Sequence, residues 1–334
     1  MQKKKLLLIF LSVILCMLTL TGCKSGVSDT DRNAGMPDSG RTKKRIVCTT
    51  FPQYDWIREI LGTHREDFEL TLLLDKGGDL HNYQPTAESI ATITSADMFV
   101  YVGGESDKWV EEVLQNAGNG EMLVVNLMDT LGDAVREEEA VEGMQEHHHD
   151  PVSDEKEYDE HVWLSLKNAV ILTKALSDSL KQLDATNSED FTANENAYIE
   201  ELTELDREYA DAVSKSAVKT LLFGDRFPFR YLTEDYGIDY YAAFTGCSTE
   251  TEASFETITF LSGKADELGL GAILVIEGSD HKIAELIKQN TRDKNQEILT
   301  LNSLQSVTTK DIDGGFTYLD AMRDNLEILK KALH

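Results

Sequence analysis

Short runs rich in β-branched and aromatic residues alternate with amphipathic helical patterns along most of this chain. In its first half, the runs with strand character lie at 45–50, 68–74, 98–102 and 122–127. The helical patterns that follow them lie at 56–61, 86–95, 107–117 and 167–183. Strands that alternate with helices in this way are typical of a parallel sheet covered by helices on both faces, so the sequence predicts an α/β fold.

The second half of the chain repeats this rhythm after one long helical stretch. Residues 188–214 carry apolar side chains at alternating spacings of four and three, which predicts a single helix about 40 Å long. Beyond it, strands are predicted at 219–223, 238–242, 272–277 and 297–301, and helices at 228–235, 254–268, 280–292 and 315–332. We therefore predict two lobes, at 45–187 and 215–334, each a parallel sheet flanked by helices and joined by the helix 188–214.

The N-terminus has the features of an export signal. Three lysines at 3–5 precede an apolar stretch at 6–20, which is too short for a comfortable membrane span. The Leu-Thr-Gly-Cys run that ends at Cys23 resembles a bacterial lipobox, in which the cysteine is lipidated. We expect a lipoprotein signal peptide at 1–22 and a flexible tether at 23–44; an ordinary signal peptide or a membrane anchor is the alternative. The protein is thus expected outside the cytoplasm, attached to the bacterial cell membrane through a lipid on Cys23.

The charge of the chain limits its partners. With 60 acidic residues against 32 lysines and arginines, its formal net charge is −28. This balance argues against nucleic-acid binding, because lysines and arginines must neutralise phosphates there. Cations are favoured as ligands, although most of these carboxylates are expected to form a solvated surface.

Two histidines fall in loops that follow strands of the first lobe. His81 lies in a glycine-containing loop after 68–74, and His161 lies beside two acidic residues, Asp159 and Glu160. Ligands of parallel sheets bind at the carboxyl ends of the strands, so both histidines are candidate metal ligands; a surface histidine is the alternative reading of His161. The long loop before His161 carries a histidine run at 147–149, which either collects metal or is simply a polar loop.

The segments around these histidines resemble a known family. His81-Asn-Tyr-Gln-Pro-Thr86 is similar to a His-x-Tyr-x-Pro-Thr segment of the metal-binding lipoproteins of zinc and manganese ABC importers, and His161-Val-Trp-Leu164 with Lys167-Asn-Ala169 resembles their second histidine motif. The resemblance extends over 45–333. It implies a two-lobed, monomeric receptor that holds one transition-metal ion between its lobes and delivers it to a membrane permease. It also implies that the helix 188–214 is a rigid strut that restricts hinge motion.

The resemblance leaves the second-lobe ligands open. Members of this family usually have a histidine where Arg226 stands here, and a guanidinium has no lone pair for a metal ion. The neighbouring Asp225 has oxygens to offer. The family also takes a carboxylate ligand from the neighbourhood of 277–281, where Glu277, Asp280 and His281 are the candidates. Arg226 is expected to pair with Glu277 or Asp280 when the site is empty, or to orient a carboxylate that binds the ion. The alternative for His281 is an exposed helix residue.

Nitrogen and oxygen donors of this kind suit Zn(II) well and Mn(II) tolerably. We therefore expect the transported ion to be Zn(II), with Mn(II) as the alternative. Two other classes compete with a receptor: a surface-anchored zinc hydrolase and an adhesin stabilised by metal. The chain lacks His-Glu-x-x-His, Gly-x-Ser-x-Gly and a P-loop, so we do not expect an enzyme. Cys48 and Cys247 are either a disulfide pair or, as we favour, two buried small hydrophobic residues.

Overall fold

The computed structural model describes residues 43–145, 156–248 and 252–334. The predicted signal peptide, Cys23, nearly all of the predicted tether and the histidine run 147–149 lie outside these ranges. Within them, every helix is too short or too polar to cross a membrane.

The first lobe is built on a sheet of parallel strands in the order β2-β1-β3-β4. The strands are β1 (Lys44–Cys48), β2 (Phe68–Leu72), β3 (Met98–Tyr101) and β4 (Leu123–Asn126). The helices of this lobe are α2 (Phe51–Leu61), α3 (Ala87–Thr94), α4 (Trp109–Gln115), α5 (Leu127–Leu131) and α6 (Leu166–Leu183). These bounds lie within a few residues of the predicted strands and helices, and the unforeseen α5 follows β4 directly.

Successive residues of a strand point to opposite faces of the sheet, and here both faces are covered. On β1, Ile46 and Cys48 pack into a cluster with α2 and α6, whereas Val47 packs with Phe99 and with residues of α3 and α4 on the other side. The strand residues are therefore apolar on both faces of the sheet. For this reason the strands appear in the sequence as continuous hydrophobic runs.

The second lobe has a sheet of the same kind, with parallel strands in the order β6-β5-β7-β8. Its strands are β5 (Thr220–Phe227), β6 (Asp239–Thr245), β7 (Ala272–Ile276) and β8 (Glu297–Leu301). Its helices are α8 (Arg230–Tyr236), α9 (Phe255–Leu268), α10 (Lys282–Asn290), α11 (Thr309–Asp313) and α12 (Tyr318–Ala332). Helices α9 and α10 cover one face, and α12 packs on the other. The fold is the predicted α/β fold of two helix-flanked parallel sheets.

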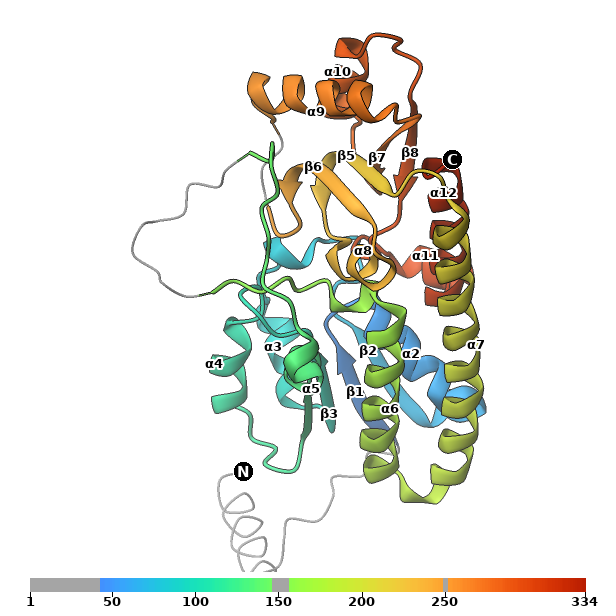
Figure 1. Cartoon of the computed structure of the whole chain (residues 1–334). Helices are drawn as coiled ribbons and strands as arrows, with labels where there is room; N and C mark the ends of the chain where they lie inside the picture. Colours follow the sequence, from blue (N-terminus) through green and yellow to red (C-terminus); the bar gives the residue numbers. More distant parts are fainter. Residues whose placement is uncertain (1–42, 146–155, 249–251) are drawn as a thin grey trace, which may run out of the picture. The chain divides into compact units, whose positions relative to one another are not determined.

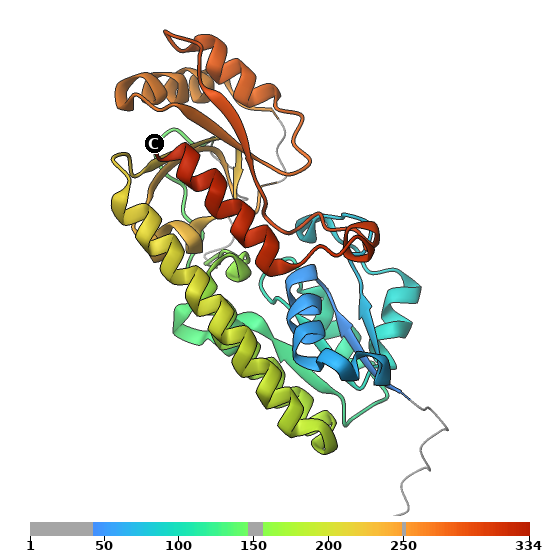
Figure 2. The same ribbon diagram turned by 90° about the vertical axis from the view of Figure 1, so that its right-hand side faces the viewer.

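A single helix, α7 (Ser188–Lys215), connects the two sheets as predicted. It packs against α2 and α6 of the first lobe and against α8 and α12 of the second, so it runs alongside both lobes (Figure 1). Seen from the side, α7 and the C-terminal α12 lie next to each other (Figure 2). The largest core cluster contains residues of both lobes, among them Ile46 of β1 and Leu274 of β7. The lobes thus share one hydrophobic core.

Buried hydrogen bonds also cross from one lobe to the other. The Trp163 indole donates to the Ser303 carbonyl at 2.9 Å, and the Tyr318 hydroxyl donates to the Trp163 carbonyl at 2.6 Å. The Tyr318 backbone N–H donates to the Asp55 carboxylate at 2.7 Å. These bonds attach α12 and the loop after β8 to α2 and to the segment that follows His161, which resists relative movement of the sheets there.

Candidate metal centre

His81 is held by a short turn at the carboxyl edge of the first sheet. Residues Leu80–Asn82 form one turn of 3₁₀ helix, and the carboxylate of Asp79 caps it by accepting the His81 backbone N–H at 3.0 Å. The Leu80 side chain is buried and anchors this turn in the core. The His81 ring is nearly covered, with 4% of its side chain exposed, and its Nδ1 lies 2.9 Å from the Ser106 hydroxyl.

His161 is fully buried at the start of a second short turn, Val162–Leu164, which leads into α6. The carboxylate of Asp159 accepts both the His161 backbone N–H at 2.8 Å and the ring Nδ1 at 3.0 Å. The Trp163 ring packs edge-on against the imidazole, and Ser165 caps α6 through its hydroxyl. The apolar part of this motif is therefore the packing that fixes the histidine.

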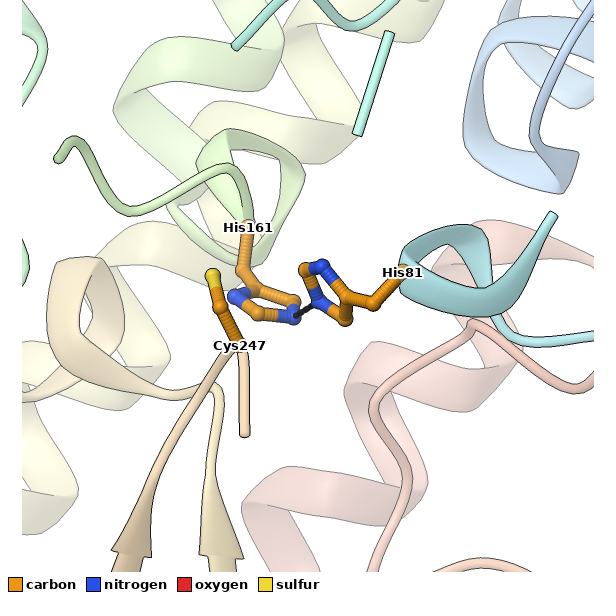
Figure 3. A group of neighbouring side chains, drawn as sticks. All are labelled: His81, His161 and Cys247. Atoms are coloured by element: carbon orange, nitrogen blue, oxygen red, sulfur yellow. Dashed lines mark hydrogen bonds between the residues drawn. The ribbon is translucent and has the colours of Figure 1, made fainter. Parts of the chain in front are cut away.

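The two imidazole rings face each other through their outer nitrogens. The Nε2 atoms of His81 and His161 are 3.1 Å apart (Figure 3). Each Nδ1 faces a carboxylate: Asp159 for His161, and Glu160 for His81 at 3.3 Å. A carboxylate accepts hydrogen bonds, which favours the tautomers with the proton on Nδ1 and leaves Nε2 as the donor atom for a metal ion. In the metal-free pair the two Nε2 atoms are within hydrogen-bond distance, and a metal ion would take the place of the proton that they share.

Burial and charge act against each other at these groups. Burial lowers the pKa of His161, but the Asp159 carboxylate and its hydrogen bond outweigh burial and raise it. Burial raises the pKa of Glu160, but the hydrogen bond from His81 and the Ser106 hydrogen bonds hold it below its usual range. Glu160 is therefore ionised although it is only 1% exposed. Carboxylates that fix the tautomer of a histidine and increase its basicity are the usual second shell of a metal site.

A cysteine completes the group, and the sequence did not predict it as a ligand. The ligand atoms of His81, His161 and Cys247 lie within 4.8 Å of one another (Figure 3). Cys247 follows β6, so it comes from the second lobe. The structure has Cys48 and Cys247 as free cysteines, and the buried-hydrophobe interpretation is right for Cys48 alone. In the sequence, Cys247 could have been recognised as a candidate ligand from its position after a predicted strand of a parallel sheet.

Arg226 links the segment that carries His81 to the loop that carries Cys247. Its guanidinium forms an ion pair with Asp79 at 2.6 Å and donates to the Ser248 carbonyl at 3.2 Å. The expected pairing of Arg226 with Glu277 or Asp280 is wrong, because the loop that carries His81 provides a closer carboxylate. Burial raises the pKa of Asp79, but Arg226 and His81 together outweigh burial and lower it.

The other residues predicted as ligands are not brought to the histidines. Both oxygens of Glu277 accept hydrogen bonds from the loop after β8, including the Ser303 backbone N–H and hydroxyl at 2.7 Å each. Asp225 accepts the Arg226 and Ile276 backbone N–H groups. These hydrogen bonds hold the second-lobe loops together, and coordination of an ion by Glu277 or Asp225 stays a prediction.

Asp280 and His281 lie further along the same edge, before α10. Asp280 is exposed and pairs with Lys282, whose hydrogen bond lowers the pKa of Asp280. His281 is exposed, which agrees with the alternative stated above, and its backbone has a positive φ of 61°. Their coordination of an ion stays a prediction without geometric support.

One cavity is lined by residues of this group, and a second lies against Arg226 and Asp79. A cavity of about 470 Å³ is lined by His81, Glu160 and Cys247 and by three further glutamates, Glu105, Glu138 and Glu157. A second cavity, of about 570 Å³, lies on the Arg226 side and is lined by Asp79, Asp225, Glu277 and Asp280, among others. Both linings carry more acidic than basic side chains, which attracts cations to the centre.

Comparison with known proteins identifies the family. Residues 46–332 match the family described as "Zinc-uptake complex component A periplasmic", which is most of the chain. The chain belongs to this zinc-uptake family. Its sequence is 30% identical to the "Zinc-binding lipoprotein AdcA" of Streptococcus pneumoniae over 332 residues, 98% of this chain and 61% of that protein. It is 28% identical to the "High-affinity zinc uptake system protein ZnuA" of Bacillus subtilis over 95% of both chains. The chain spans about 61% of the length of the AdcA relatives that it matches.

Solved structures of the family have the same fold. The Zn(II)-bound ZnuA-like domain of S. pneumoniae AdcA matches 87% of this chain and 99% of its own, with a TM-score of 0.68 and 27% identity. The metal-dependent lipoprotein YcdH of B. subtilis matches with a TM-score of 0.71 and 26% identity, over 87% of this chain and 100% of its own. The expected resemblance to metal-binding lipoproteins of ABC importers is thereby confirmed.

Proposed function

We propose that this protein is the extracytoplasmic receptor of an ABC importer, which captures one Zn(II) ion between its lobes and delivers it to a membrane permease. The observation that carries this proposal is the pair of buried histidines whose Nε2 atoms are 3.1 Å apart. With Zn–N bonds of about 2.0–2.1 Å, this separation corresponds to an N–Zn–N angle of roughly 100°, close to a tetrahedral angle.

Zinc is the ion that these donors favour. Two imidazoles with carboxylates behind them suit Zn(II), whereas Mn(II) prefers a shell of oxygen ligands. The zinc-binding names of the relatives that match nearly the whole chain agree with this choice. An Mn(II) receptor of the same type is the alternative.

The protein acts on its ion by binding and release, without chemical turnover. A zinc hydrolase needs a general base beside a metal-bound water. Here Asp159 and Glu160 are each engaged by the Nδ1 atom of one histidine. Both carboxylates are therefore used to orient ligands, which favours a binding protein over a hydrolase.

The N-terminal segment of the chain agrees with an anchored receptor. Export through the signal peptide at 1–22 and lipidation of Cys23 would hold the protein outside the cytoplasm, at the surface where its permease lies. The relative in S. pneumoniae is named a lipoprotein. Labelling of cells with a radioactive fatty acid tests this part, because the Cys23→Ala variant should lose the label.

Calorimetric titration with ZnCl₂ tests the function itself. We expect one ion per chain, and we expect His81→Ala and His161→Ala each to weaken binding by roughly 100-fold or more, since loss of a second-shell partner alone costs 10–100-fold. His281→Asn tests the remaining histidine candidate; it changes an exposed residue in a backbone conformation that asparagine tolerates, and it should leave affinity unchanged.

Removal of zinc with a chelator separates a receptor from an adhesin with structural metal. The receptor should keep its far-ultraviolet circular dichroism and lose only thermal stability, by RT ln(1 + [Zn]/Kd) in free-energy terms. Unfolding upon chelation, or binding that survives both alanine substitutions, would overturn the proposal.

A further inference from the structure

We infer that Cys247 is the third protein ligand of this metal ion, supplied by the second lobe through a thiolate. The inference rests on the proposed function, because it completes the same centre. It assigns a His₂Cys donor set and therefore a class of ions: zinc and softer metals, with Mn(II) excluded.

The place of Cys247 follows from the pairing of β5 with β6. The register places Arg226 opposite Phe244 and Phe227 opposite Thr245, so the end of β6 lies directly beside the residue that occupies the expected histidine position. Cys247 comes two residues after Thr245. The chain thus offers a donor just after the neighbouring strand, where β5 has an arginine that cannot ligate a metal.

The separation of the three donors suits a small change upon binding. For Zn–N bonds of about 2.0–2.1 Å and a Zn–S bond of about 2.3 Å, tetrahedral geometry requires roughly 3.4 Å between nitrogens and roughly 3.6 Å between nitrogen and sulfur. The nitrogens are 3.1 Å apart, and the sulfur lies within 4.8 Å of the two. A movement of about 1 Å by the loop after β6 therefore closes the site.

The loop is already tied to both histidine-bearing segments. Arg226 joins the Ser248 carbonyl, next to Cys247, to Asp79, which caps the turn of His81. The Cys247 backbone N–H donates to Glu138 at 3.0 Å. Gly246 lies against the His161 ring, where a Cβ atom would be 3.1 Å from Cε1. These three sets of contacts hold the loop of Cys247 close to the two imidazoles.

The bond change is simple. The thiol of Cys247 loses its proton to solvent, its sulfur lone pair forms the Zn–S bond, and nothing is oxidised or reduced. The two imidazoles remain neutral, because each keeps its proton on Nδ1, where it faces a carboxylate. The fourth position stays open to water from the cavity of about 470 Å³ that Cys247 lines, which provides a path for exchange. Thiolate binds zinc strongly and manganese poorly, so Cys247 selects between them.

Cobalt(II) spectroscopy on the full-length protein tests the inference. Co(II) replaces Zn(II) and reports a coordinated thiolate by a sulfur-to-metal charge-transfer band in the near ultraviolet, whereas its visible d–d bands report tetrahedral binding of any donor set. We expect both kinds of band in the wild-type protein. Cys247→Ser should lose the charge-transfer band and weaken zinc binding by roughly tenfold or more. The matched control is Cys48→Ala, which removes the fully buried core thiol and should retain the band.

The outcomes separate the two proposals. Visible d–d bands without a charge-transfer band, or a band that persists in Cys247→Ser, would refute the thiolate ligand and leave the zinc receptor standing. Absence of all Co(II) bands together with absence of zinc binding would refute both. Loss of the band in Cys247→Ser with an unchanged melting temperature of the metal-free protein is the result that we expect.

Discussion

Substitution of Gly246 by alanine tests how closely the second lobe approaches His161. A Cβ atom at this position would lie 2.8 Å from the Phe227 carbonyl oxygen and 3.1 and 3.2 Å from Cε1 and Nδ1 of His161. Carbon–carbon contacts are optimal at about 3.5–4.0 Å, so the loop after β6 must shift by roughly 0.5 Å away from the imidazole. The backbone φ of Gly246 is not in the left-handed region, so this clash is the cost of the substitution.

Overpacking of this kind costs about 1–3 kcal/mol. If the zinc-bound arrangement bears the whole cost, zinc binding weakens by roughly 5- to 150-fold, at about 1.4 kcal/mol per tenfold. Zinc competition with a chromogenic chelator measures the affinity, and thermal unfolding of the metal-free protein measures how much of the cost falls on the fold itself.

Gly263→Ala is the matched control for Gly246→Ala. Gly263 lies in α9 with no atom within 4 Å of the position of an added Cβ. Alanine there should stabilise the helix by up to about 1 kcal/mol and leave zinc affinity unchanged. Wild-type zinc affinity in Gly246→Ala would refute the close approach of the two lobes at the metal centre.

Two further predictions concern stability away from the ligands. Tyr318→Phe removes the buried 2.6 Å hydrogen bond to the Trp163 carbonyl and should lower the free energy of unfolding in urea by about 1–3 kcal/mol while Co(II) spectra stay unchanged; an unchanged urea midpoint would contradict it. The hydrogen bond to Asp190 at 2.8 Å raises the pKa of His64, so its contribution to stability is complete below the ordinary histidine pKa of 6.5 and disappears as pH rises through the raised value. Asp190→Asn should therefore flatten the change in Tm between pH 6 and pH 8.5, and equal pH profiles would refute this coupling.

The fold was largely predictable because the strands of both sheets are buried on two faces. They appear in the sequence as short apolar runs, and the alternation with helices then determines the parallel topology. The main departure is β5, which continues to Phe227 although its apolar run ends at Phe223. The register with β6 shifts between Phe223 and Arg226. The last part of β5 therefore contains polar residues, which the hydrophobic pattern does not predict to be part of a strand.

The two halves of the metal centre differ in how far the sequence revealed them. His81 and His161 follow from their motifs and from their place beside strand ends, and the structure brings their rings together. Glu277 also stands at a strand end, but the sequence does not show that the backbone N–H groups of 303, 305 and 306 fold onto its carboxylate. Cys247 lacks a spacing motif, because the loops that bring it to the histidines come from other parts of the chain.

The core that the lobes share makes the receptor one thermodynamic unit. Because the largest cluster of buried side chains runs from β1 to α12, we expect the two sheets to unfold together. The free energy that zinc contributes at one edge is therefore distributed over the whole unit. Where cleavage at the far end of α7 requires this joint unfolding, we expect bound zinc to slow it, so that protease susceptibility there reports the occupancy of the metal centre.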